Sequence, residues 1–300
     1  MSSTSATSTF DRHKARSFVR TEAPPKLPAT WRALRAALRA ASWASPELGA
    51  QLAQAAFRTP PRARTSPADE DALLLARRLE VRLDRAPLAT WAFGAGPTVL
   101  LVHGWGGRGV QLRAFIAPLV ARGHRVVLFD APAHGATPGK RSSAPELARA
   151  VGAVLESIGP VHAIVAHSMG AASSVLATQV APTTPLVMLA PARDARLFTG
   201  RFAWAMGFDD AQRARFEAAL ERNVGHALSS LDVAQHPRDV PVLVVHDELD
   251  KEIPIEEGAR IAATWPRATL VRTRGLGHVR LLRDPEVVAR AVAFVEGIAR

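Results

Sequence analysis

The chain has 300 residues, 48% of them hydrophobic, with a formal net charge of +11, no cysteine and no tyrosine. This is enough for one large core, or a core and a smaller domain, while the composition excludes disulfides, a thiolate nucleophile, cysteine zinc sites and a phenolic acid or base. The positive charge comes without a basic-aromatic platform or a nucleic-acid motif, so we expect no nucleic-acid partner.

The first residues, 1–29, are rich in Ser, Thr, Arg and Pro, which predicts a disordered tail. The tail lacks the apolar run of a secretory signal. No window of about 18 apolar residues occurs in the chain, so no transmembrane helix is predicted. We therefore expect a cytoplasmic protein.

Residues 30–71 are predicted to form an N-terminal helical segment followed by a linker. Thr30 is a candidate cap for a first helix, and Ser45-Pro46-Glu47 has the composition of a second helix start. The apolar residues at helical spacing are Trp31, Leu34, Leu38, Leu48, Leu52 and Ala55. This basic amphipathic pair could make weak contact with a membrane surface, or pack on the main domain through Trp31 and the leucines. We favour packing.

Short apolar strands alternate with helices over residues 72–300. Strands are predicted at 79–83, 88–93, 99–102, 125–129, 161–165, 186–189, 242–245 and 268–272. Helices are predicted at about 110–121, 144–158, directly after Ser168, and 285–298. This alternation predicts an α/β fold with a mostly parallel central sheet and helices on both faces.

The alternation stops at about residues 191–237. This stretch has a helical pattern, and its large apolar residues are Phe202, Trp204, Met206, Phe208 and Phe216. An insertion at this point lies above the carboxyl edge of the sheet, where open α/β folds bind ligands. We therefore predict a small helical cap over a ligand site.

The most informative motif is Ala166-His167-Ser168-Met169-Gly170, which stands between an apolar strand and a helix of small residues. A serine on such a turn, with small residues two positions away on each side, indicates a nucleophile elbow. The chain passes close to itself at this turn, and only glycine or alanine permits that approach.

Four further motifs follow other strands in order. They are His103-Gly104-Trp105-Gly106-Gly107, Asp130-Ala131-Pro132-Ala133-His134-Gly135, Val244 to Asp250 with Ile253-Pro254, and Gly275-Leu276-Gly277-His278. With these motifs the chain resembles the α/β-hydrolase family, in its esterase- and lipase-like branch, from about residue 79 to its end. The order Ser, Asp, His is that of the family's catalytic triad. Two departures are Ala166, where the elbow commonly has glycine, and Asp247, where many relatives have glycine.

The resemblance implies a role for each site residue. Ser168 is the expected nucleophile, His278 the base that activates it, and Asp250 the acid that orients His278. The backbone N–H groups of Trp105 and Met169 are the expected oxyanion hole. Asp247 also follows a strand and is the alternative acid, although the spacing to Ile253-Pro254 favours Asp250.

The resemblance also implies a serine hydrolase that cleaves a carboxylic ester through an acyl-enzyme intermediate, without metal or organic cofactor. The expected substrate is a small-molecule ester with an apolar group. Thioesters, lactones and amides are alternatives, and so is a catalytically idle fold that binds a ligand or partner. We expect the remaining polar residues of the motifs to be structural: His103, His134, His167 and Asp130. His246 has no assigned role.

Overall fold

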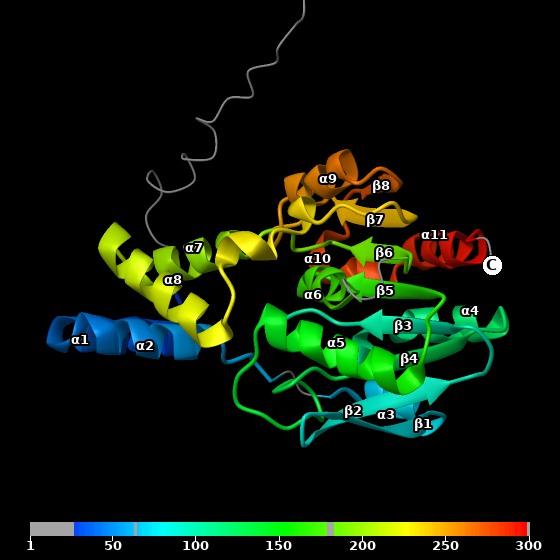
Figure 1. Cartoon of the computed structure of the whole chain (residues 1–300), viewed down its shortest axis with the longest axis horizontal. Helices are drawn as coiled ribbons and strands as arrows, with labels where there is room; N and C mark the ends of the chain where they lie inside the picture. Colours follow the sequence, from blue (N-terminus) through cyan, green and yellow to red (C-terminus); the bar gives the residue numbers. More distant parts are fainter. Residues whose placement is uncertain (1–26, 63–64, 179–182, 299–300) are drawn as a thin grey trace, which may run out of the picture.

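An eight-stranded sheet forms the centre of the computed structural model, which describes residues 27–62, 65–178 and 183–298 (Figure 1). The strand order is β1-β2-β4-β3-β5-β6-β7-β8. The strands are β1 (Arg77–Leu83), β2 (Ala86–Phe93), β3 (Thr98–Val102), β4 (Arg125–Phe129), β5 (Ala163–His167), β6 (Leu186–Leu189), β7 (Val242–Asp247) and β8 (Ala268–Thr273). β1 and β2 pair antiparallel, as do β2 and β4, and the other pairs are parallel. The predicted mostly parallel α/β fold is confirmed.

Helices cover both faces of this sheet, which is why its central strands are continuous apolar runs. On β3, Leu100 and Val102 pack with α5 (Ala144–Ile158), α6 (Met169–Ala177) and α9 (Ile255–Thr264). Val99 and Leu101 point to the opposite face. There they pack with η2 (Gly109–Phe115), α4 (Ile116–Ala121), η6 (Leu281–Arg283) and α11 (Pro285–Glu296).

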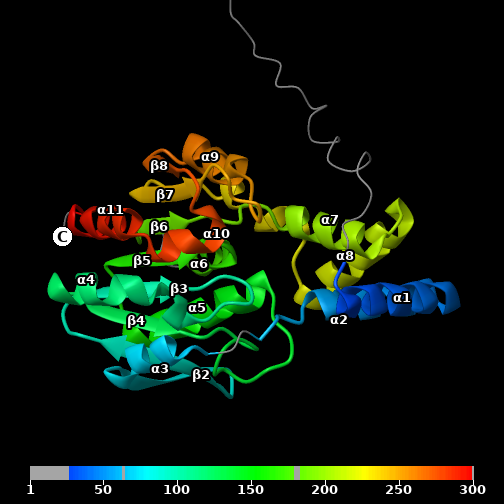
Figure 2. The ribbon, with the colours of Figure 1, turned by 180° about the vertical axis from the view of Figure 1, so that it is seen from behind.

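A helical unit stands beside the sheet, and Figure 2 shows it from the opposite side. The 191–237 insertion forms α7 (Ala195–Met206), α8 (Asp210–Val224), η4 (Leu228–Leu231) and η5 (Val233–Gln235), and the N-terminal segment forms α1 (Ala29–Ala44) and α2 (Pro46–Phe57). Its core is apolar, with Phe57 against Phe202 and Phe216 at ring distances of 5.4 and 5.6 Å. The N-terminal helices therefore pack on the cap helices rather than on the sheet.

The two faces of the N-terminal helices have different surroundings. Leu38 is buried in the helical unit, and Trp31 approaches Phe202 edge-on. Leu48 and Leu52, which we expected to pack, are about half exposed, and Trp43 is 91% exposed. The cap thus covers Leu38 of α1 but leaves Trp31 42% exposed, and membrane contact of these helices stays a prediction. Among the described residues, no helix has both the length and the apolar character needed to cross a bilayer.

Some helices and one strand differ in type or bounds from those predicted. The helix expected at 110–121 begins as the 3₁₀ segment η2 and becomes α-helical only at Ile116. A helix that starts in the predicted linker and runs past its end at residue 71, α3 (Pro67–Leu74), begins with a reciprocal capping box between Ser66 and Asp69. The strand expected at 161–165 is β5, two residues later, where Ala163 pairs with Val99. Of the predicted tail, residues 1–26 lie outside the described residues. The expected end of the tail and the expected cap are wrong, because α1 begins at Ala29 with Pro28, not Thr30, at its N-cap position.

Candidate active site

Ser168 occupies a strained turn between β5 and α6. Its φ is 54° and its ψ is −124°, a backbone conformation that residues other than glycine rarely adopt. A Cβ at Gly170 would lie 2.4 Å from the carbonyl oxygen of His103, so only glycine fits there. A Cβ at Gly104 would lie 2.7 Å from the Cβ of Ser168. The turn therefore has the close approaches expected of a nucleophile elbow.

His278 and Asp250 meet although they follow different strands. Asp250 lies in the turn after β7, and His278 lies in the short helix α10 (Gly277–Arg280) after β8. The Nδ1–H of His278 donates to Oδ2 of Asp250 at 2.8 Å. The backbone N–H groups of Glu252 and Ile253 donate to the other carboxylate oxygen at 2.8 and 2.9 Å.

The side chain of Asp250 is fully buried, yet its charged form is favoured. Burial alone would raise the pKa of Asp250. The imidazoles of His246 and His278 and the N–H of Ile253 outweigh burial and hold this pKa far below its usual range. An ionised Asp250 keeps the proton of His278 on Nδ1, so that Nε2 is free to accept a proton.

The alternative acid, Asp247, has different partners. Its carboxylate accepts hydrogen bonds from Thr273 Oγ1 at 2.9 Å and from the N–H groups of Leu276 and Leu249 at 2.9 and 3.0 Å. It thereby ties the end of β7 to the loop that leads to His278. Of the two acids, the structure brings Asp250 and not Asp247 to the imidazole of His278.

Ser168 is linked to the His278 loop through its neighbour. The Nε2–H of His167 donates to the backbone carbonyl of His278 at 3.0 Å. The hydrogen bonds of the described residues do not include a direct one between the Ser168 hydroxyl and His278. Contacts between a nucleophile and its base are often loose without substrate and tighten in the complex.

The loop that carries Trp105 is held by His103. The Nδ1–H of His103 donates to the carbonyl of Gly104 at 2.7 Å, and its Nε2 accepts the N–H of Ala131 at 3.0 Å. Burial lowers the pKa of His103 to about 4, so the ring is neutral and this pattern persists at neutral pH. Trp105 lies in this loop, and Met169 is the first residue of α6, where helix N–H groups lack helical acceptors. Their role as an oxyanion hole stays a prediction.

The other motif residues expected to be structural support their own loops. His134 donates from Nδ1 to the carbonyl of Pro132 at 2.9 Å, and burial lowers its pKa to about 4. Asp130 accepts the N–H groups of Gly109 and Ala136 at 2.7 and 2.8 Å. These expectations are confirmed.

Two residues near the site had no role assigned from the sequence, His246 within the acid motif and Glu252 just after it. His246 donates from Nε2 to the carbonyl of Ile253 at 3.0 Å, and the same nitrogen lies 3.6 Å from Asp250 Oδ2. Oε2 of Glu252 lies 3.9 Å from Nε2 of His278. The signal that could have found them is their spacing, since they stand four residues before and two residues after Asp250.

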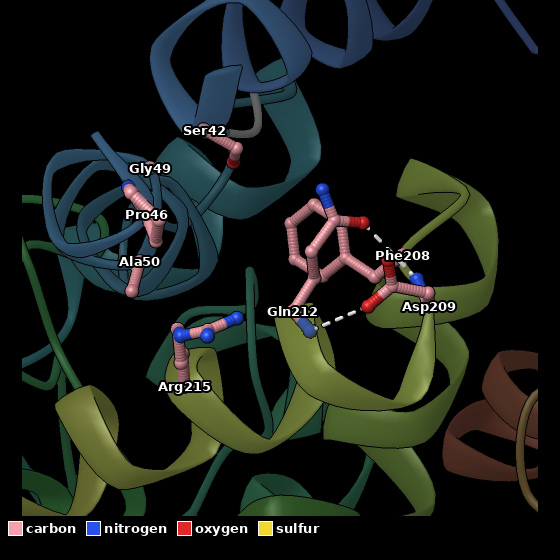
Figure 3. Close-up of a pocket in the computed structure, with 8 residues that line it drawn as sticks. All are labelled: Ser42, Pro46, Gly49, Ala50, Phe208, Asp209, Gln212 and Arg215. Carbon is pink, nitrogen blue, oxygen red and sulfur yellow. Dashed lines mark hydrogen bonds between the residues drawn. The ribbon is translucent and has the colours of Figure 1, made fainter. Parts of the chain in front are cut away.

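A pocket of about 200 Å³ lies in the helical unit, away from these residues. Figure 3 shows it between the α1–α2 hairpin and α8, with the polar groups of Asp209 and Gln212 joined to each other. These two residues form the capping box of α8, so their hydrogen-bonding capacity is used for the helix start. The pocket is lined by Ser42, Pro46, Gly49, Ala50, Phe208, Asp209, Gln212 and Arg215, which include none of the predicted catalytic residues.

Comparison with known proteins assigns the family. Residues 99–291, more than half of the chain, match the model of the alpha/beta hydrolase family. The chain therefore belongs to the α/β-hydrolase family, as the motifs predicted. No curated protein matches its sequence.

Several solved structures are similar in fold. An esterase from Pyrococcus furiosus shares 20% identity over 80% of this chain and 96% of its own, with a TM-score of 0.57. A serine hydrolase involved in carbazole degradation shares 20% identity over 74% and 99%, with a TM-score of 0.55. A bacterial membrane phospholipase A shares 19% identity over 77% and 88%, with a TM-score of 0.58. At these identities the likeness concerns the fold.

Proposed function

We propose that this protein is a serine hydrolase that cleaves a carboxylic ester through an acyl-enzyme intermediate. The observation that carries the proposal is the 2.8 Å hydrogen bond from His278 to the buried Asp250, beside the strained turn of Ser168. The solved structures that are similar in fold include an esterase and a serine hydrolase. This likeness supports hydrolysis of an ester by a serine hydrolase as the reaction class.

The reaction follows from the chemistry of these groups. The Ser168 hydroxyl attacks the ester carbonyl while Nε2 of His278 takes its proton. The backbone N–H groups of Trp105 and Met169 stabilise the negative oxygen of the tetrahedral intermediate. The intermediate then collapses, and His278 returns the proton to the departing alcohol. Water attacks the acyl group in the same manner and releases the acid and free Ser168.

Asp250 contributes through His278. It holds the imidazole in the tautomer that accepts a proton at Nε2, and its negative charge stabilises the imidazolium that forms. The backbone donors on Asp250 fix the carboxylate in place, so little reorganisation accompanies the proton transfer.

The proposed substrate is a small ester with an apolar group. Leu249 directly precedes Asp250 and is 52% exposed, and Val279 directly follows His278 and is 45% exposed. Exposed apolar side chains next to both residues of the hydrogen-bonded pair offer contact area to an alkyl or aryl group.

The test is hydrolysis of p-nitrophenyl esters from acetate to palmitate by the wild type, Ser168→Ala and Ser173→Ala. Ser173 is a buried serine on α6, the helix that follows Ser168, and its hydroxyl donates to the carbonyl of Ala144, so it is a matched control. We expect turnover in the wild type and in Ser173→Ala and none in Ser168→Ala. Wild-type turnover in Ser168→Ala would overturn the proposal. Absence of turnover on every ester would favour a thioester, lactone or amide substrate, or an idle binding fold.

A further inference from the structure

Glu252 has a fixed position relative to the proposed triad. It lies in the turn between β7 and α9, and its N–H donates to Asp250 Oδ1 at 2.8 Å. Its carbonyl oxygen accepts a hydrogen bond from the guanidinium of Arg201 on the cap helix α7. Although its side chain is 66% exposed, the backbone from which it extends is held on both sides.

The imidazole of His278 lies between two carboxylates. Asp250 stands 2.8 Å from Nδ1, and Glu252 stands 3.9 Å from Nε2, the nitrogen that exchanges the proton with Ser168 in the proposed mechanism. A separation of 3.9 Å is too long for a hydrogen bond. The relation of Glu252 to His278 is therefore one of charge, without a hydrogen bond.

Two guanidinium groups near this turn contact backbone carbonyls, and the exposed Lys251 lies in the turn between Asp250 and Glu252. The guanidinium of Arg201 contacts the Glu252 carbonyl, and that of Arg280 contacts the carbonyls of Leu276 and Gly275. The ring of His167 lies 4.6 Å from that of His278. Burial lowers the pKa of His167 to about 3, so this ring is neutral. Among the described residues, the carboxylates that form ion pairs with His278 are those of Asp250 and Glu252. Of these two carboxylates, Glu252 is the exposed one.

We propose that Glu252 is a specificity-determining residue whose carboxylate disfavours esters that carry a negative charge near the scissile bond. This inference rests on the proposed function, because it concerns substrates that react at Ser168 and His278. A substrate carboxylate close to the reacting carbonyl comes within several ångströms of Glu252 and meets like charge. At about 6 Å in a solvated site, such a repulsion lowers the rate by about three- to tenfold, and salt screens it.

The test compares two substrates of equal acyl length, p-nitrophenyl butyrate and mono-p-nitrophenyl succinate, in which a carboxylate replaces the terminal methyl group. The rate of spontaneous hydrolysis, which this carboxylate accelerates, is subtracted for each substrate. Glu252→Gln removes the charge and keeps the shape. Glu256→Gln removes an exposed charge from the first turn of α9 and serves as the control. We expect Glu252→Gln to raise the succinate-to-butyrate ratio of kcat/KM by about three- to tenfold at low ionic strength, with a smaller gain in about 0.5 M salt. Glu256→Gln should keep the wild-type ratio.

The contrary results are separable. An unchanged ratio in Glu252→Gln, with both esters hydrolysed, would overturn this inference and leave the proposed function standing. A change that persists in high salt would also overturn it, because the effect would then be one of shape. Absence of turnover on both esters in the wild type would overturn the proposed ester hydrolysis and this inference with it.

Discussion

His167 and His278 are joined by a 3.0 Å hydrogen bond from the Nε2–H of His167 to the backbone carbonyl of His278, and their rings lie 4.6 Å apart. Because His167 directly precedes Ser168, this bond connects the proposed nucleophile turn to the loop of the proposed base. Burial lowers the pKa of His167 to about 3. The ring therefore stays neutral, and in the proposed mechanism it adds no repulsion to the imidazolium that His278 forms.

The buried histidines predict how stability depends on pH. The native pKa values of His103 and His134 are lowered to about 4, and that of His167 to about 3, whereas an unfolded histidine titrates near 6.5. The unfolded chain therefore binds more protons than the native protein below pH 6.5. The contribution of the three buried histidines to the free energy of unfolding is complete above that pH and is lost as the pH falls towards 4. Each group contributes up to about 1.4 kcal/mol of this loss per pH unit.

Urea unfolding at pH 7, 6, 5 and 4 measures this dependence. The lowered pKa of Asp250 acts in the same direction at still lower pH, and the raised pKa of Asp130 opposes it. His134→Asn removes one titrating group while an amide can replace the donor to Pro132, so its pH dependence should be shallower than that of the wild type. A free energy of unfolding that stays constant from pH 7 to 4 would contradict the burial of neutral histidines.

The two acids of the β7 turn should respond differently to the same change. Asp250→Asn should lower kcat by about 10³-fold or more with the fold intact, because an amide no longer fixes the tautomer of His278. Asp247→Asn should keep kcat within about tenfold of wild type but lower the free energy of unfolding by about 1–3 kcal/mol, since Asp247 is fully buried and accepts several loop donors. The reverse pattern would assign the acid role to Asp247.

A methyl group at Gly104 should disturb the nucleophile directly. The added Cβ would lie 2.7 Å from Ser168 Cβ and 3.2 Å from His167 Nδ1, so one of the two chains must shift. A displacement of about 1 Å at the reacting atoms can lower turnover by about 10²-fold, which is the loss we expect. The control is Gly152→Ala in the interior of α5, where an added Cβ meets no atom within 4 Å. It should keep full activity; equal activity of both variants would contradict the close packing of the elbow.

Packing of the N-terminal helices on the cap can be measured with two leucines. Leu38 is 1% exposed in the core of the helical unit, whereas Leu48 is 48% exposed. Leu38→Ala should lower the free energy of unfolding by about 2–5 kcal/mol. Leu48→Ala should change it by less than about 1 kcal/mol. Equal effects in urea unfolding would contradict the observed orientation of the hairpin.

Elements with strong local signals were predictable from the sequence. The helix 144–158 lies between a capping serine at Ser143 and a glycine at Gly159, and the structure begins and ends it at the predicted residues. β4 and β6 also have their predicted bounds, because short apolar runs of a parallel sheet are covered on both faces. The contact of α1 and α2 with α7 and α8 was not predictable, since it joins segments far apart in the chain whose apolar faces carry no information about their partner.

The sequence predicted which residues form the candidate site better than it predicted how they are arranged in space. Motif order singled out Ser168 and His278, and the spacing to Ile253-Pro254 favoured Asp250 as the acid while Asp247 remained the alternative. What separates them is the path of the turn after β7, which directs Asp247 to the backbone of the His278 loop and Asp250 to the ring. The proximity of Glu252 to His278 depends on the same path, and its sequence signal is limited to its position two residues after Asp250.

The most direct test of the central claim is labelling with a fluorophosphonate probe followed by peptide mass spectrometry. Such a probe reacts with a serine only when a neighbouring base activates it. We predict one adduct in the wild type, on the peptide that contains Ser168, and none in Ser168→Ala or in His278→Ala. An unlabelled wild-type protein, or an adduct that persists in Ser168→Ala, would contradict the assignment of Ser168 as an activated nucleophile.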